Sequence, residues 1–180
     1  MATVTLRPAS DGTYDSAWAL TGGTAGLAYT TINESVTDDT TYISNNDTSS
    51  PYDKQSVTLT SMPAAASISS VVISWRSRSA FTTAATVAFY RLGGSDTENG
   101  GTTVNATDTT YTWDVTADRS WTDTDINSLE IGWRRNQLAS NTVRITQAWV
   151  DITYAPPAAI PPGLLIRPQR TVNRTVRRII

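Results

Sequence analysis

The chain is built from short segments in which apolar and polar residues alternate. In the segment 68–78, Val71, Ile73 and Trp75 fall on one parity, and Ser74, Arg76 and Arg78 fall on the other. Successive side chains of a β-strand point to opposite faces, so this period of two predicts a strand with one buried face. We expect Val71, Ile73 and Trp75 to face the core.

The same alternation, with many β-branched and aromatic residues, predicts strands elsewhere along the chain. The further predicted strands are residues 3–7, 28–33, 40–44, 55–60, 86–92, 109–116, 129–135 and 143–154. Clusters such as Asp38-Asp39 and Gly93-Gly94 separate them, as expected of turns. Many short strands with few helical segments predict an all-β fold, a jelly-roll-like antiparallel β-sandwich.

One segment departs from the strand pattern. Residues 121–129 read WTDTDINSL, and their threonine and aspartates are typical of the cap of a short helical turn. We therefore expect one brief helix there, just before the strand at 129–135, and little helix elsewhere.

A domain boundary is predicted at Tyr154. Residues 155–163 contain four prolines, which favour an extended polyproline conformation over a sheet interior. Residues 1–154 form the predicted sandwich domain, with 9 basic and 16 acidic side chains, whereas 155–180 carry five arginines and no acid. An acidic body with an extended, Pro- and Arg-rich C-terminal arm is therefore predicted.

The arm combines basic and large apolar residues. An apolar segment of this kind is rarely left in water without a partner. We therefore expect it to bind another protein, with arginines contacting carboxylates and apolar side chains entering grooves. The predicted partner-binding residues are Leu164, Leu165, Ile166, Arg167, Arg170, Arg174, Arg177, Arg178, Ile179 and Ile180.

Two other uses of the arm stay open. It can fold back on its own acidic body or on a symmetry mate, and its residues 170–180 alternate well enough to add as a strand to a neighbour's sheet edge. Nucleic acid is not the expected partner, because the acidic body offers no second basic surface in the sequence.

The composition excludes much catalytic chemistry. The chain has no cysteine and no histidine, so a thiol nucleophile, a Ser-His triad and the usual structural zinc site are all excluded. The commonest general base at neutral pH is also missing. We therefore expect no enzyme activity and no cofactor.

Two weaker binding hypotheses remain. The aspartates Asp108, Asp114, Asp118, Asp123 and Asp125 offer oxygen ligands of the kind calcium prefers, although turn and cap roles explain them as well.

Six tryptophans suggest sugar stacking, although five of them fit core positions. Trp18, just before a glycine-rich loop, is expected to be the most exposed. The chain shows no leader segment and no apolar run long enough for a membrane span, so no membrane partner is expected.

The last part of the body resembles a pattern common in structural proteins of tailed phages. Residues 121–133, WTDTDINSLEIGW, match its W-T-x-x-D-[IL]-x-x-L-x-x-G turn and strand, and residues 143–156 match its V-R-[IV]-x-Q-x-x-V-x-[IV]-x-Y-x-P terminal strand. Leu6-Arg7-Pro8, Asp11-Gly12, Trp18 and residues 38–43 are similar in style, so the resemblance covers most of residues 1–156.

This resemblance implies a virion β-sandwich protein. We expect a capsid decoration (cement) protein on the capsid surface, made in the cytoplasm of the bacterial host, with the arm as a clamp on the major capsid protein or another virion protein. A homo-oligomer is expected, with a trimer favoured. The alternative is a tail or fibre module that binds host carbohydrate. The resemblance does not extend to the arm and supplies no catalytic residues.

Overall fold

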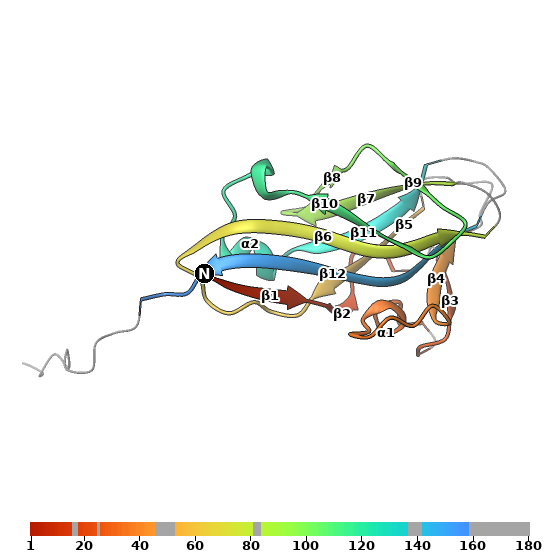
Figure 1. The fold of residues 1–180 in the computed structure, drawn as a ribbon, viewed down its shortest axis with the longest axis horizontal. Helices are drawn as coiled ribbons and strands as arrows, with labels where there is room; N and C mark the ends of the chain where they lie inside the picture. Colours follow the sequence, from red (N-terminus) through yellow and green to blue (C-terminus); the bar gives the residue numbers. More distant parts are fainter. Residues whose placement is uncertain (16–17, 25, 46–52, 81–83, 137–141, 159–180) are drawn as a thin grey trace, which may run out of the picture.

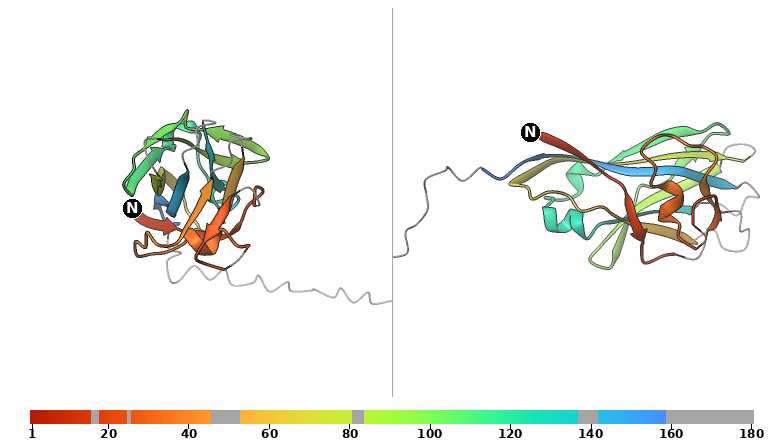
Figure 2. Two further views of the ribbon diagram at one scale, coloured as in Figure 1. Left: turned by 90° about the vertical axis from the view of Figure 1, so that its right-hand side faces the viewer. Right: turned by 90° about the horizontal axis from the view of Figure 1, so that it is seen from below.

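The computed structural model describes residues 1–15, 18–24, 26–45, 53–80, 84–136 and 142–158. Within them, two six-stranded antiparallel sheets face each other and form a jelly-roll-like β-sandwich (Figures 1 and 2). The predicted all-β antiparallel sandwich is therefore confirmed. No helix of the described residues is long and apolar enough to cross a membrane.

Sheet A is built around the two longest strands. Its strand order is β10-β6-β12-β4-β3, and β1 also pairs with β12. Its strands are β1 (Ala2–Leu6), β3 (Ala19–Thr21), β4 (Tyr42–Asn45), β6 (Ser67–Ser79), β10 (Thr109–Asp114) and β12 (Val143–Ala155).

Sheet B covers the other side of the core in the order β2-β5-β11-β7-β8, with β9 also paired to β7. Its strands are β2 (Pro8–Asp11), β5 (Lys54–Leu59), β7 (Ala84–Leu92), β8 (Ser95–Glu98), β9 (Thr102–Val104) and β11 (Glu130–Arg135). The short strands β8 and β9 lie in a segment expected to be a polar loop. Gly93 and Gly94 have φ of 59° and 85°, and this left-handed conformation closes the tight β7-β8 turn; the glycine pair predicted the turn, but the sequence pattern missed the strand that follows it.

The core lies between the sheets and contains two fully buried indoles. Trp75 of β6 and Trp133 of β11 are each 0% exposed. Val71 and Ile73 are buried with Trp75, as the alternation predicted.

A β-bulge in β12 explains an irregular sequence pattern. Buried apolar residues fall on odd positions up to Ile145 and on even positions from Ala148 onward. The register shifts between Ile145 and Gln147, so one extra residue on β12 restores the inward direction of the side chains that follow.

The predicted strand at residues 28–33 is wrong: this segment contains α1 (Tyr29–Ile32). Ala28 and Ile32 are both buried, and residues four apart lie on one face of a helix. The Tyr29 amide also donates to the Asp11 carboxylate at 2.9 Å, a contact 18 residues away. This tertiary contact and the shared buried face override the β-propensity of Tyr29, Thr30 and Thr31.

The expected helical turn is confirmed as α2 (Asp123–Asn127). Thr122 accepts a hydrogen bond from the Asp125 amide at 3.1 Å, and its own amide donates to the Asp125 carboxylate at 3.0 Å. These reciprocal bonds form a capping box, which satisfies amides at the start of the helix.

Replacing Thr122 with Ala should lower the free energy of unfolding by about 1 kcal/mol, because the cap hydrogen bond is lost. Thr124→Ala, in the same helix but with an exposed side chain, is the control and should change it little. Urea denaturation of both variants measures the difference. Equal stabilities would show that the cap contributes nothing.

Candidate binding surfaces

The arm residues predicted to bind a partner lie outside the described residues. The described chain ends with Pro156, Pro157 and Ala158, all exposed, after β12 ends at Ala155. These three residues lead away from the sandwich beyond the end of β12 (Figure 1). The structure therefore describes only the first residues after β12, and both the arm as a separate segment and the contacts of its basic and apolar residues remain predictions.

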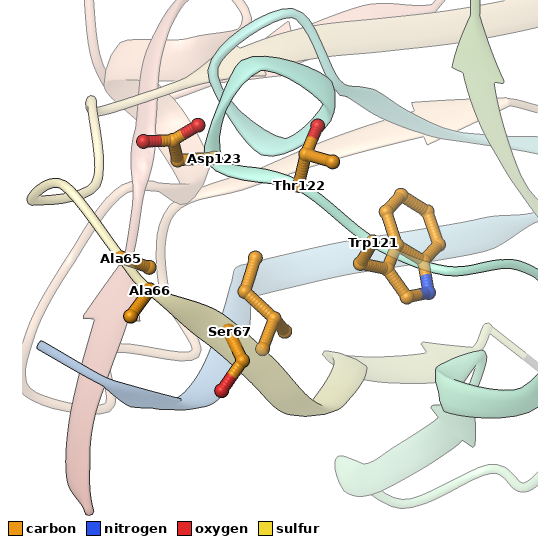
Figure 3. Close-up of a pocket in the computed structure, with 7 residues that line it drawn as sticks. Ala65, Ala66, Ser67, Trp121, Thr122 and Asp123 are labelled. Atoms are coloured by element: carbon orange, nitrogen blue, oxygen red, sulfur yellow. The ribbon is translucent and has the colours of Figure 1, made fainter. Parts of the chain in front are cut away.

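A pocket of about 180 Å³ opens at the end of the sandwich where the arm starts. It lies between the start of β6 and the start of α2, and Figure 3 shows its walls. The lining residues are Ala65, Ala66, Ser67, Ile68, Trp121, Thr122 and Asp123. The Ala66 amide donates to the carbonyl of Ala155 at 2.8 Å, so one wall is joined directly to the root of the arm.

The pocket walls are held in place by contacts outside it. The indole Nε1 of Trp121 donates to the Val115 carbonyl at 2.9 Å, and its ring meets Tyr90 edge-on at 5.5 Å between centroids. Thr122 is fixed by the capping box described above. The Asp123 side chain has no hydrogen-bond or ion-pair partner among the described residues, and it is partly exposed. The pocket is thus a hollow lined by the apolar Ala65, Ala66, Ile68 and Trp121 and by the polar Ser67 and Thr122, with the Asp123 carboxylate at its rim.

A second surface is the outer face of sheet B, where opposite charges form a network. Asp96 accepts hydrogen bonds from Lys54 at 2.6 Å, Arg91 at 2.7 Å and the Tyr14 hydroxyl at 2.9 Å. Glu98 of the same strand accepts from Arg134 at 2.6 Å.

Two aromatic rings lie beside this network. The Lys54 ammonium lies 4.9 Å from the centroid of the buried Phe89 ring, and Tyr14 meets Phe89 edge-on at 5.8 Å. The face therefore presents hydrogen-bonding groups that are fixed in position next to aromatic carbon.

The pKa shifts follow from these contacts. Burial would raise the pKa of Asp96, but the hydrogen bonds from Lys54, Arg91 and Tyr14 outweigh it and leave that pKa below its ordinary value. The hydrogen bond from Arg134 lowers the pKa of Glu98. The hydrogen bond to Asp96 raises the pKa of Tyr14. The first two shifts keep Asp96 and Glu98 ionised at neutral pH, and the third keeps the Tyr14 hydroxyl protonated, so that it donates to Asp96.

Asp96→Asn should destabilise the protein at pH 7 by about 2 kcal/mol, since three donors lose a charged acceptor. Because the folded-state pKa of Asp96 is lowered, its contribution is present above its unfolded pKa and is lost as pH falls through the folded value. The gap between variant and wild type should therefore close below about pH 4.

The control for this measurement is Asp118→Asn, since Asp118 is exposed in the 3-10 turn Thr116–Asp118. Thermal unfolding from pH 7 to pH 2 tests the prediction. A gap that stays constant with pH would rule out a charged Asp96 as its source.

A third cluster lies on the outer face of sheet A. Arg76 donates to both carboxylate oxygens of Asp39 at 2.7 Å, while Arg78 lies 3.6 Å from Asp108. Arg144 is paired with Arg78 across β6 and β12.

The arginine side chains of this cluster are only partly satisfied. The guanidinium of Arg144 lies 4.3 Å from the centroid of the Tyr42 ring. Buried Nε atoms of Arg78 and Arg144 have no hydrogen-bond partner among the described residues. Like charges opposite each other are unfavourable, so Asp108 and Tyr42 compensate for part of this repulsion.

The tryptophan prediction needs one correction. Trp18, expected to be the most exposed, is 5% exposed, and its Nε1 donates to the Asp53 carbonyl at 3.1 Å. This contact joins residues 35 positions apart, and the local sequence around Trp18 does not predict it. Trp113 and Trp149 are instead the half-buried tryptophans. Trp149 lies on the outer face of sheet A, with Arg7 at 5.6 Å from its ring.

The five aspartates considered as calcium ligands lie at separate places and have different structural roles. Asp108 pairs with Arg78, Asp114 accepts from the Thr116 amide at 2.9 Å, and Asp125 caps α2. Asp118 lies in the 3-10 turn and Asp123 at the pocket. Among the described residues, no group of three or more His, Cys, Asp or Glu side chains is arranged to hold a metal ion.

Comparisons with known proteins give a likeness of fold. The sequence matches no protein-family model and no curated protein. A carbohydrate-binding module of family 29 aligns over 93% of this chain and 100% of its own, with a TM-score of 0.50 and 12% identity. The xylan-binding module CBM15 aligns over 87% of this chain and 100% of its own, with a TM-score of 0.46 and 14% identity.

The coat protein of Tobacco streak virus aligns over 91% of this chain and 93% of its own, with a TM-score of 0.32 and 13% identity. The likeness to the family 29 module shows a shared β-sandwich fold. The other two are weaker, and no argument rests on them.

Proposed function

We propose that this chain is a non-catalytic structural protein of a tailed-phage particle, a capsid decoration protein that the C-terminal arm clamps onto its partner. One observation carries the proposal: the described body has little apolar surface with which to dock. Its exposed large hydrophobic residues are Met1, Leu27 and Val36. The apolar anchors available for a stable contact are in the sequence of the arm, next to its five arginines.

The sequence resemblance to tailed-phage structural proteins gives the proposal its setting. A decoration protein repeats over the whole shell, so a modest contact at each copy stabilises the particle through multivalency. The partner expected for the arm is the major capsid protein, whose carboxylates would pair with the arginines.

Copy number tests this proposal. A stained gel of purified particles should show this chain at hundreds of copies, in a fixed ratio to the major capsid protein. A few dozen copies or fewer would instead assign it to the tail or a fibre.

The second candidate function is carbohydrate binding by a tail or fibre module, favoured by the network on the outer face of sheet B. Lys54, Arg91 and Asp96 present fixed donors and acceptors beside Tyr14, the combination that holds sugar hydroxyls and stacks on sugar rings. The likeness of fold to a carbohydrate-binding module supports this candidate.

Calorimetric titration with neutral oligosaccharides tests the second candidate. If a sugar binds on this face, Arg91→Ala should weaken binding at least tenfold and Arg119→Ala, near α2, should not. Equal affinities of the two variants would exclude this face.

A further inference from the structure

The pocket at the root of the arm has the shape and chemistry of a receptor for a short apolar and basic segment. A single water molecule needs only about 10–15 Å³ of such space, whereas this pocket offers about 180 Å³. Carbon atoms of Ala65, Ala66, Ile68 and Trp121 form one part of its lining, and Ser67, Thr122 and Asp123 form the polar part. The indole Nε1 of Trp121 is already bonded to the Val115 carbonyl. An apolar side chain of the ligand can therefore pack against the first part while a polar or charged group meets the second.

The rim of the pocket adds a charge requirement. Asp123 lines the pocket, and its carboxylate has no partner among the described residues (Figure 3). The nearby Arg119 donates to Asp125 at 3.0 Å and its guanidinium lies 5.5 Å from the centroid of the Trp121 ring, so it is paired with a different carboxylate from Asp123. A ligand that places a cation beside its apolar group would pair with Asp123.

The arm carries this combination in consecutive residues. Leu164, Leu165 and Ile166 are followed directly by Arg167. We propose that the pocket receives residues 164–167 of a second copy of this chain, with an apolar side chain inside and Arg167 on Asp123. This inference rests on the proposed function, because it takes the arm as the attaching element, and it names a partner for one part of that arm.

The geometry at the start of the arm favours a second copy over the same chain. Ala155 is joined to the pocket wall through Ala66, and Pro156–Ala158 lead away from the body (Figure 1). An extended proline-rich segment advances about 3.1 Å per residue, so nine residues in that conformation would reach roughly 28 Å. A reach of that length is sufficient to place the apolar triplet in the pocket of a neighbouring copy.

Contacts of this kind are heterologous, since an arm on one copy meets a pocket on the next. Such contacts close into a ring when the rotation between copies allows it and otherwise run on as a filament. A ring of three copies, the oligomer favoured from the sequence, would bury three arms in three pockets.

A charge swap in the full-length chain tests the inference. Self-association is measured by sedimentation velocity over a range of concentrations. Asp123→Arg and Arg167→Asp should each weaken it at least tenfold, while the double variant should recover it. Asp15→Arg, which reverses an exposed acid in the loop after β2, is the matched control and should associate like wild type.

Mixing the two single variants distinguishes an arm that binds the pocket of a second copy from an arm that binds the pocket of its own chain. In a contact between the two variants, each arm meets a pocket of opposite charge, so association should return as dimers or other assemblies in which the variants alternate, whereas a closed ring of three would keep one like-charged contact. A wild-type chain that stays monomeric, single variants that associate normally, or a mixture that stays monomeric would overturn the inference.

Failure of the pocket proposal can be told apart from failure of the proposed clamp on the capsid. If Asp123→Arg leaves particle binding intact while deletion of the arm abolishes it, and no self-association is found, the arm clamps the particle and the pocket proposal fails. If the charge swap controls self-association but arm deletion leaves particle binding unchanged, the pocket proposal holds and the clamp on the capsid fails.

Discussion

Trp133→Ala should reduce the free energy of unfolding by about 3–5 kcal/mol, the largest stability effect expected of a single substitution here. Trp133 is 0% exposed at the centre of β11, between Gln55 of β5 and Ala88 of β7. Both neighbouring strands are fixed in the sheet, so they cannot collapse onto the cavity that alanine would leave. For a chain of this size the melting temperature should fall by roughly 10 °C.

Two further variants show that lost volume causes the effect. Trp133→Phe should cost clearly less than alanine, because the Trp133 Nε1 has no hydrogen-bond partner among the described residues and only part of the ring is removed. Trp149→Ala, the matched control on the outer face of sheet A, removes a half-buried indole and should cost about 1 kcal/mol. Chemical denaturation measures the free energy of unfolding of all three variants. Equal losses at Trp133 and Trp149 would contradict the assignment of the core.

The second large effect is expected in binding to the particle. Replacing Arg174, Arg177 and Arg178 together with Ala should weaken binding at least tenfold and flatten its salt dependence, because screened ionic contacts are lost. Replacing Leu164, Leu165 and Ile166 with Ser should also weaken binding but leave the salt dependence nearly unchanged, because these contacts are apolar.

A salt series of pull-downs on particles that lack this protein separates the two kinds of contact. Arg76, Arg78 and Arg144 on the body are the control set, since they already face Asp39, Asp108 and Tyr42. If their replacement flattens the salt dependence as much as the arm substitutions do, the ionic contacts are made by sheet A rather than by the arm.

The parts of the fold that local alternation determines could be predicted from the sequence. In β6, Val71, Ile73 and Trp75 face the core, because a strand with one buried face must alternate. The cap of α2 was also predictable, since Thr122 and Asp125 stand at the spacing that a capping box requires.

The parts that depend on long-range contacts could not be predicted. The buried Trp18 donates a hydrogen bond to the carbonyl of Asp53, 35 residues away. Residues 28–33, expected as a strand, contain α1, whose Tyr29 amide bonds to Asp11. The network on sheet B joins Lys54 to Asp96, which are 42 residues apart. The pocket is likewise formed by residues at the start of β6 and the start of α2, and no local sequence pattern predicts that these segments meet.

The central claim is that the arm, and not the sandwich, attaches this protein to the particle. Deleting residues 157–180 removes no described strand, because β12 ends at Ala155. The truncated body should therefore unfold within about 0.5 kcal/mol of the full chain. Its binding should be measured by pull-down on particles lacking the protein, beside the full chain. The account predicts a loss of at least a hundredfold in affinity for the truncated body; binding equal to that of the full chain would contradict it and assign attachment to the faces of the sandwich.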